Sequence, residues 1–182
     1  AGEGGGPGFP RASGNLYDKG VRAPLMICWP GHVPGGRVVD DFGNLMDLAP
    51  TFLEAAGGTP PVGMDAHSLM PLLLSDRSGV VDKSRDAVIL GRERHAHRHP
   101  MRGIRTADFL YIRNYREDLR PTAAETLANP AAAMHMSDGP TKQFLIAHMD
   151  DPGVKGRVLL GFARRPNEEL YDVRNDPGQV YN

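Results

Sequence analysis

A short apolar run, APLMICW at residues 23–29, limits the possible folds of this chain more than any other segment. Arg22 precedes the run, and Pro30 and Gly31 end it. A run of this length between a charged residue and chain breakers is typical of a strand that is buried on both faces, as in a parallel sheet. We therefore predict an α/β fold in which residues 23–29 form a strand.

The only cysteine of the chain, Cys28, lies at the end of this run beside the only tryptophan, Trp29. A nucleophilic thiol needs exposure together with a nearby base or helix N-terminus, whereas a cysteine in an apolar run behaves as a small hydrophobe. We predict that Cys28 is a core residue. A single cysteine also excludes an internal disulfide framework and a zinc site made of cysteines.

The segments that follow predict two helices and then a region of strands. Apolar residues recur at helical spacing between Leu45 and Ala56, with Asp47 as a candidate cap and Gly57 at the end. From Asp86 onward the chain is richer in aromatic and β-branched residues, which favour strands. The other predicted elements are a short helix, a β-hairpin, a later helix and a last strand before an Asx-Pro turn: residues 68–74, residues 104–106 with 109–113, residues 142–148, and ELYDVRNDPGQ.

Composition places the chain among globular proteins. Of its 182 residues, 40% are hydrophobic and 24% are charged, and the net charge is -1. This balance supplies a core and argues against a general nucleic-acid coat. No run approaches the roughly 18 apolar residues of a membrane helix, and no signal peptide opens the chain. Residues 1–14 are so rich in glycine and proline that we expect a loop entered from an upstream segment, and hence a fragment.

Basic residues concentrate in one stretch, because residues 92–120 hold eight arginines and four acids. Within it, His95, His97 and His99 alternate, so a strand there would place three imidazoles on one face. Three interpretations remain open for this row. It could bind zinc or copper, it could form a cationic rim for a sulfate or carboxylate group, or it could be an exposed strand without a ligand.

Seven segments, taken in order, resemble the C-terminal part of sulfatases in the alkaline-phosphatase-like superfamily, nearest to the bacterial and heparan N-sulfatase subgroup. They are FPRASGNLYDKGVRAPLMICWPG, DLAPTFLEAAG, MDAHSLMPLL, GRERH, PMRGIRTADFLYIRNY, SDGPTKQFL and EELYDVRNDPGQ. The resemblance implies that residues 1–85 are the C-terminal end of the α/β catalytic domain. It also implies that residues 86–182 are a small α+β subdomain with an antiparallel sheet.

The resemblance further implies hydrolysis of sulfate esters or N-sulfates. In that family a cysteine of a Cys-x-Pro-Ser-Arg signature becomes formylglycine, whose hydrate attacks sulfur. A divalent cation, Ca²⁺ or Mg²⁺, and a lysine stabilise the sulfate oxygens. This chain lacks the signature, has Gly4-Gly5-Gly6 where the family has its Asp-Asn-Gly ligands, and has Ser13 where the family has the lysine. We therefore expect no catalytic residue and no metal ligand here, and an inactive isolated chain.

The remaining site residues implied by the resemblance are Arg94 and His95 in GRERH, which would border the substrate cleft and select an anionic saccharide. The expected partners are a sulfated small molecule or saccharide, with no nucleic acid and no membrane. An unpaired sheet edge predicts association, either with the missing N-terminal part or as a homo-oligomer. The compartment would be periplasmic or extracytoplasmic if a signal peptide precedes the chain. The alternatives are a non-catalytic module that binds sulfated glycans, and part of a related phosphodiesterase or phosphonate hydrolase.

Overall fold

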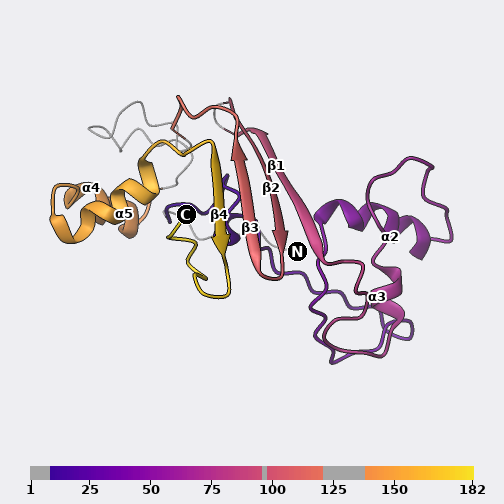
Figure 1. Cartoon of the computed structure of the whole chain (residues 1–182). Coiled ribbons are helices and arrows are strands. Elements are labelled where there is room, and N and C mark those ends of the chain that lie inside the picture. Colours follow the sequence, from indigo (N-terminus) through magenta and orange to yellow (C-terminus); the bar gives the residue numbers. More distant parts are fainter. Residues whose placement is uncertain (1–8, 96–97, 121–137) are drawn as a thin grey trace. The chain divides into compact units, whose positions relative to one another are not determined.

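The structure is a computed structural model that describes residues 9–95, 98–120 and 138–182 (Figure 1). Its helical elements are α1 (Asp18–Val21), the 3₁₀ turn η1 (Leu45–Asp47), α2 (Leu48–Ala55), α3 (Met70–Leu74), α4 (Pro140–Ala147) and α5 (Pro152–Phe162). Its strands are β1 (Ala87–Arg94), β2 (Arg98–Thr106), β3 (Phe109–Asn114) and β4 (Glu168–Asp172). Among the described residues, no helix has the length and apolar character needed to cross a bilayer.

The chain divides into two compact units. The helical unit is Met26–Val88, and the sheet unit is Ala1–Leu25 together with Ile89–Asn182. The N-terminal segment belongs to the sheet unit because Leu16 and Tyr17 are buried in the same hydrophobic cluster as the strands. A domain boundary between residues 85 and 86 stays a prediction.

The sheet unit is built on one four-stranded sheet with the order β1-β2-β3-β4. Strands β2 and β3 form the predicted hairpin, in a register that runs from Met101 opposite Asn114 to Arg105 opposite Leu110. Strand β4 pairs antiparallel with β3, so the predicted last strand is present as well. The sheet and its helices confirm the predicted α/β fold with an antiparallel sheet.

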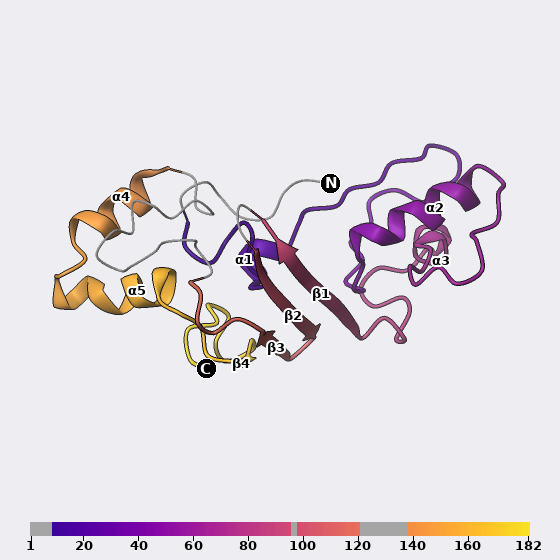
Figure 2. The same cartoon turned by 90° about the horizontal axis from the view of Figure 1, so that it is seen from above.

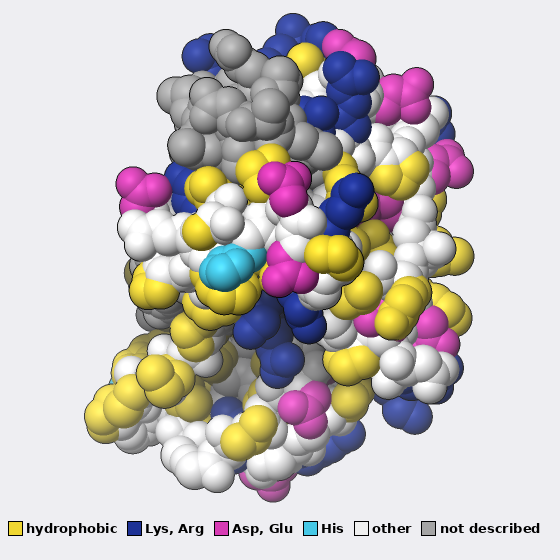
Figure 3. All heavy atoms as spheres, turned by 90° about the vertical axis from the view of Figure 1, so that its left-hand side faces the viewer, with side chains coloured by type: hydrophobic (Ala, Val, Ile, Leu, Met, Phe, Trp, Pro, Cys, Tyr) yellow, Lys and Arg dark blue, Asp and Glu magenta, His cyan; other side chains and the backbone are white. Residues whose placement is uncertain are grey.

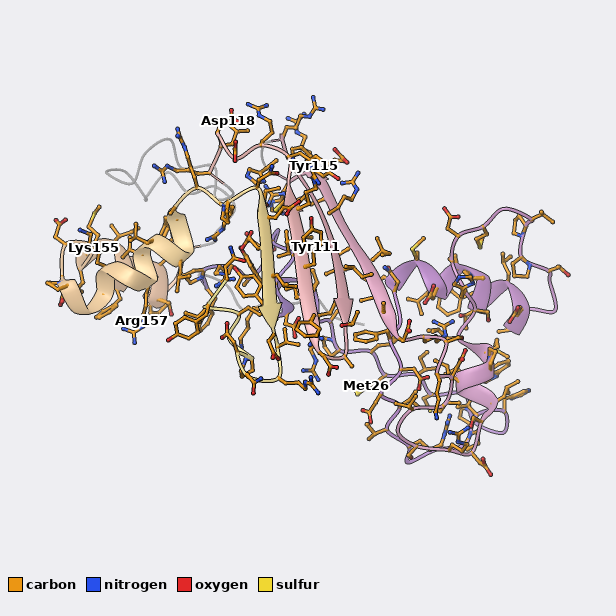
Figure 4. The ribbon with its side chains drawn as sticks, in the orientation of Figure 1. Met26, Tyr111, Tyr115, Asp118, Lys155 and Arg157 are labelled. Carbon is orange, nitrogen blue, oxygen red and sulfur yellow. The ribbon has the colours of Figure 1, made fainter. Side chains whose placement is uncertain are left out.

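The two faces of this sheet differ, because alternate residues of a strand point to opposite sides. The inner face packs against the N-terminal segment that contains α1 (Figures 1 and 2), and the buried cluster there is Leu16, Tyr17, Met101, Leu110, Ile112, Tyr171 and Val173. On the outer face, Ile104 and Leu170 stand opposite Tyr111 from either side. Ile104 and Leu170 are exposed, and Figure 4 shows Tyr111 on this face of β3. The sheet therefore has one packed face and one face that still presents apolar side chains.

Helices α4 and α5 pack on each other through Leu145, Val154, Val158 and Phe162. Helix α4 confirms the helix predicted at residues 142–148. Helix α5 was not predicted, because its sequence PGVKGRVLLGF contains glycines, which weaken helices. Its first turn compensates for them. Proline occupies a first-turn position, and the Asp151 carboxylate accepts a hydrogen bond from the Gly153 N–H at 2.8 Å.

The helical unit contains both helices predicted for this part of the chain, α2 and α3. Asp47 has a different role from the predicted cap, because its side chain makes no capping bond to α2. Its carboxylate accepts hydrogen bonds from the backbone N–H groups of Asn44 and His67, both at 3.0 Å. It also pairs with Arg85 at 3.0 Å. Asp47 thus ties three separate segments of this unit together.

Residues 23–29 form no strand, contrary to the prediction. Met26, labelled in Figure 4, is 88% exposed, Leu25 is 41% exposed and Cys28 is exposed. A strand needs a neighbour that pairs with its N–H and C=O groups, and the sheet of the described residues places none beside this run. The prediction that Cys28 is a core residue is therefore wrong. Apolar composition alone did not establish burial.

Candidate functional site

An open hollow in the sheet unit is the candidate site. Its volume is about 450 Å³, and its lining comes from residues 14–16, 20–21 and 91–95. These residues belong to two segments: the turn together with α1, which follows it, and the end of β1 with His95. The predicted site residues Arg94 and His95 both lie in this lining. The fold therefore brings them to the segment that contains Ser13.

A tight turn forms one wall of the hollow. The Asn15 backbone N–H donates to the Ala12 carbonyl at 3.0 Å, and the Asn15 side-chain amide donates to the carbonyls of Ala12 and Ser13, both at 3.3 Å. Gly14 has a φ of 75°, in the left-handed region that favours glycine. A Cβ on Gly20 would stand 2.4 Å from the carbonyl oxygens of Ala12 and Asn15. Glycine at position 20 thus lets α1 pack closely under the turn.

Arg92 fastens this turn to β1. Its Nη1 donates a hydrogen bond to the carbonyl oxygen of Gly14, and the side chain is buried. Burial lowers the pKa of the Arg92 guanidinium to about 10, so the group still carries its charge at neutral pH. Arg92 therefore positions the wall of the hollow. Arg94 and His95 line the hollow as well.

His95 follows the last residue of β1 and packs on the turn. Its ring lies 3.5 Å from the place that a Cβ on Gly14 would occupy. Both Arg94 and His95 are exposed at the hollow. A guanidinium and an imidazolium both donate hydrogen bonds to oxyanions. The hollow can therefore hold an anionic group beside Ser13 and Gly14.

The two described histidines of this row, His95 and His99, do not share one strand face, contrary to the prediction. β1 ends at Arg94 and β2 begins at Arg98, so His95 and His99 do not belong to one strand. His95 is exposed, whereas His99 is fully buried in β2. His97 lies outside the described residues. The alternation predicted one strand, but His95 follows β1 and His99 lies within β2.

The donor set of the hollow does not fit a divalent cation. Glu93 is the one carboxylate in the lining that the structure describes, and its side chain pairs with Arg102. Arg92 and Arg94 add positive charge, which repels a cation, and Ca²⁺ takes about six to eight oxygen ligands. Over the described ranges as a whole, no group of three or more His, Cys, Asp or Glu side chains is arranged to hold a metal ion. We therefore assign no step in this chain to the Ca²⁺ or Mg²⁺ that the resemblance implies.

A buried polar network lies on the same inner face of the sheet. The Glu169 carboxylate accepts hydrogen bonds from the Tyr17 hydroxyl at 2.7 Å, the Tyr171 hydroxyl at 2.6 Å and the Asn114 side-chain amide at 2.8 Å. Burial raises the pKa of Tyr17 to about 12, so its hydroxyl remains a donor. Sequence reasoning missed this network, because Tyr17 and Glu169 are 152 residues apart. The one available signal was the alternation that places Glu169 and Tyr171 on one side of β4.

Charge is mixed over the face of the molecule that carries α4 and α5. Figure 3 shows lysine and arginine side chains interspersed there with acidic and hydrophobic ones. This pattern differs from the broad basic surface of a nucleic-acid coat. On this face, recognition of an anion would depend on particular side chains rather than on a large basic field.

The sequence model of the family described as N-sulphoglucosamine sulphohydrolase, C-terminal, matches residues 13–151. The chain belongs to this family. The matched range begins at Ser13 and includes the turn, the end of β1, Arg94 and His95. The resemblance to a sulfatase C-terminal portion is thereby confirmed.

Individual relatives are sulfatases too. Ulvan-active sulfatase from Formosa agariphila is 28% identical over 171 residues, which are 92% of this chain and 30% of that protein. Human N-acetylgalactosamine-6-sulfatase is 43% identical over 63 residues, which are 34% of this chain and 12% of that protein. A protein solved in complex with its substrate D-glucosamine-2-N,6-O-disulfate is 22% identical, with a TM-score of 0.42 over 75% of this chain and 18% of that chain. This chain thus spans about 30% of the length of ulvan-active sulfatase.

Proposed function

We propose that this chain is the C-terminal portion of a sulfatase-type hydrolase that acts on sulfate esters or N-sulfates of saccharides. The observation that carries the proposal is the hollow, in which Arg94 and His95 lie beside the turn at Ser13 and Gly14. That turn is where the family resemblance implies a sulfate-binding lysine. The relatives named for ulvan and for N-acetylgalactosamine-6-sulfate support a sulfated saccharide as the ligand.

In this proposal each residue of the hollow has a limited task. Arg94 donates hydrogen bonds to the oxygens of a sulfate or other anionic group, and His95 adds a donor on the same side. Arg92 holds the turn in place through the Gly14 carbonyl. Ser13 supplies a hydroxyl where a lysine would supply a charge, so binding at that position is weakened.

We also propose that the isolated chain binds without hydrolysing. The sequence contains no Cys-x-Pro-Ser-Arg, so it offers no precursor of the formylglycine nucleophile that the resemblance implies. The residues of the hollow bind and orient an anion, but none of them supplies an attacking group of that kind. Ca²⁺ or Mg²⁺, where the complete family enzyme uses one, would be held by residues other than those of the hollow.

Calorimetric titration of the chain with D-glucosamine 6-sulfate and with unsulfated D-glucosamine tests the proposal. We expect binding of the sulfated sugar only, weakened about tenfold by Arg94→Gln and several-fold by His95→Ala, since a charge-assisted hydrogen bond contributes about 1.5–3 kcal/mol before solvent screening. Arg157→Gln is the matched control, because Arg157 is an exposed arginine on α5 (Figure 4).

A companion assay follows release of the fluorophore from an aryl sulfate ester. We expect no turnover above the uncatalysed rate. Equal binding of the sulfated and unsulfated sugars, or full affinity in the Arg94→Gln variant, would overturn the proposed role of the hollow. Turnover by the purified chain would instead contradict its proposed inactivity and leave the binding role standing.

A further inference from the structure

Two buried arginines stand out on the inner face of the sheet unit. Arg11 is 8% exposed and Arg165 is 7% exposed. Both guanidinium carbons lie near the ring of Tyr17, at 3.6 Å for Arg11 and 5.5 Å for Arg165 from the ring centre. Stacking on an aromatic ring favours a guanidinium, but it uses the flat face of the group and leaves the N–H edge unsatisfied.

One N–H edge of each arginine, formed by Nε and Nη2, has no hydrogen-bond partner among the residues that the structure describes. In the described structure, Nε and Nη2 of Arg11 and of Arg165 are buried and make no hydrogen bond. The nearby Glu169 carboxylate does not serve as their acceptor. It accepts its hydrogen bonds from Tyr17, Tyr171 and Asn114. The ion pairs recorded for the described residues are made by other basic side chains.

The same edge binds carboxylates elsewhere in this protein. Arg105 donates from Nε to one oxygen of Asp18 at 2.9 Å and from Nη2 to the other at 3.0 Å. Arg116 binds Asp118 in the same way, from Nε to one oxygen at 2.7 Å and from Nη2 to the other at 2.6 Å. The pair of Nε and Nη2 is therefore the fork with which this chain holds an oxyanion side-on.

Burial makes it energetically unfavourable for Arg11 and Arg165 to leave their Nε and Nη2 donors without acceptors. A buried charge costs several kcal/mol unless it is paired and hydrogen-bonded. Both guanidinium groups lie at Tyr17, whose hydroxyl is bonded to Glu169. Among the described residues, Glu169 is the one buried acid of this network, so the two arginines bring an excess of positive charge. An anion with two or more oxygens would supply both the missing charge and the missing acceptors.

We propose that Arg11 and Arg165 form a binding site for an oxyanion, either a free sulfate or phosphate ion or the sulfate or phosphate group of a larger ligand. The anion accepts hydrogen bonds from the Nε and Nη2 edges, while Tyr17 supports the guanidinium faces. Neither arginine belongs to the lining of the hollow. The inference therefore does not rest on the proposed function, and either one can fail without the other.

Nitrogen-detected NMR of the arginine Nε–H groups tests this site on the full chain. Two Nε–H signals are expected to shift together during a titration with sodium sulfate, and to fit one dissociation constant. Sodium chloride at equal ionic strength is expected to leave them in place. Absence of any shift, or equal shifts with chloride, would overturn the proposal.

Matched variants assign the response to its residues. Arg11→Lys and Arg165→Lys keep the charge but lack the fork, so each should remove one signal and abolish the sulfate response of the other. Arg174→Lys is the control, because Arg174 is exposed and paired with Asp108. If a lysine variant does not fold, the wild-type signals are assigned by triple-resonance spectra, and the titration decides. Unchanged sulfate affinity in both folded lysine variants would overturn the assignment.

A second titration identifies the form of the anion. Inorganic phosphate and D-glucosamine 6-sulfate are compared with inorganic sulfate through the same two Nε–H signals. Tighter binding of the sugar sulfate would assign the site to the anionic group of a larger ligand, and tighter binding of an inorganic ion would assign it to a free anion. If none of the three moves the signals, the proposal is wrong.

Discussion

Glu169 is the residue on which the interior of the sheet unit depends most. It is buried, and each of its three hydrogen bonds comes from a different element: the segment before α1, β3 and β4 itself. A buried carboxylate is tolerated where its oxygens are fully hydrogen-bonded. The arrangement therefore holds Tyr17 over the sheet, and Tyr17 lies between the residues 14–16 and 20–21 that line the hollow.

Removal of one donor from this network should cost stability. We expect Tyr17→Phe to lower the free energy of unfolding by about 1–3 kcal/mol, because it leaves a buried charged acceptor with one bond fewer. Urea unfolding followed by circular dichroism measures the change. Tyr115→Phe is the control, since Tyr115 is 54% exposed (Figure 4), and it should stay within about 0.5 kcal/mol of the wild type. Equal effects of the two substitutions would contradict the network.

Asp47 makes the folding stability of the helical unit depend on pH in the acidic range. Burial by itself raises the pKa of this carboxyl, but the N–H groups of Asn44 and His67 and the Arg85 guanidinium together lower it by more, so the net pKa is below its ordinary value. A lowered pKa in the folded state gives stability that is full above the unfolded pKa of about 3.9 and is lost as the pH falls through the folded pKa.

The fluorescence of Trp29 reports on this unit, because Trp29 is the only tryptophan of the chain and lies within Met26–Val88. We expect the denaturation midpoint from this signal to fall steeply below about pH 4. Asp47→Asn should be less stable at pH 7, by about 1–3 kcal/mol, and should lose much of that pH dependence. An Asp47→Asn chain with the wild-type pH profile would show that another group controls acid stability.

At the scale of elements, the local patterns were reliable and the long-range ones were not. The β2–β3 hairpin could be predicted because its two-residue connection at Ala107 and Asp108 is a local signal. Residues 23–29 could not be placed, since a strand depends on a partner that the run itself does not specify. The prediction that the alternating histidines share one strand face was wrong for a related reason, because alternation does not show where a strand ends.

The candidate site was likewise only partly predictable. Arg94 and His95 came from the family resemblance, and the structure brings both to the hollow. Arg92 and Gly14 were missed as a pair, although Arg92 holds the Gly14 carbonyl, because the contact joins residues 78 positions apart. Nothing local in either segment reveals that pairing. The unpaired Nε and Nη2 donors of Arg11 and Arg165 were also missed, because no local pattern brings these two distant residues together.

The packing of α1 under the turn gives a direct test at this scale. Gly20→Ala would place a methyl group 2.4 Å from the carbonyl oxygens of Ala12 and Asn15, which are backbone atoms that cannot move aside alone. We expect a loss of about 1–3 kcal/mol in unfolding free energy and weaker binding of a sulfated sugar in the hollow. Gly156→Ala is the control, because a Cβ there meets nothing within 4 Å. If Gly20→Ala kept wild-type stability, α1 would not pack as described.

At the scale of the whole molecule, the exposed outer face of the sheet is a surface through which the chain could associate with another chain. Ile104 and Leu170 are exposed on this face, and β1 and β4 are the edge strands of the sheet. Exposed apolar rows and open edges favour contacts with another chain or with a further segment of a longer protein. Association as a homo-oligomer, or with an N-terminal part, stays a prediction that light scattering over a range of concentrations can check.

The central claim is that the hollow between the Ser13–Gly14 turn and the end of β1 binds a sulfated saccharide. The most direct test is to follow the backbone amide NMR signals of the chain during titration with D-glucosamine 6-sulfate and, separately, with D-glucosamine. The account predicts saturable shifts concentrated at residues 14–16, 20–21 and 91–95 with the sulfated sugar alone. Shifts that avoid these residues, or that are equal for the two sugars, would contradict it.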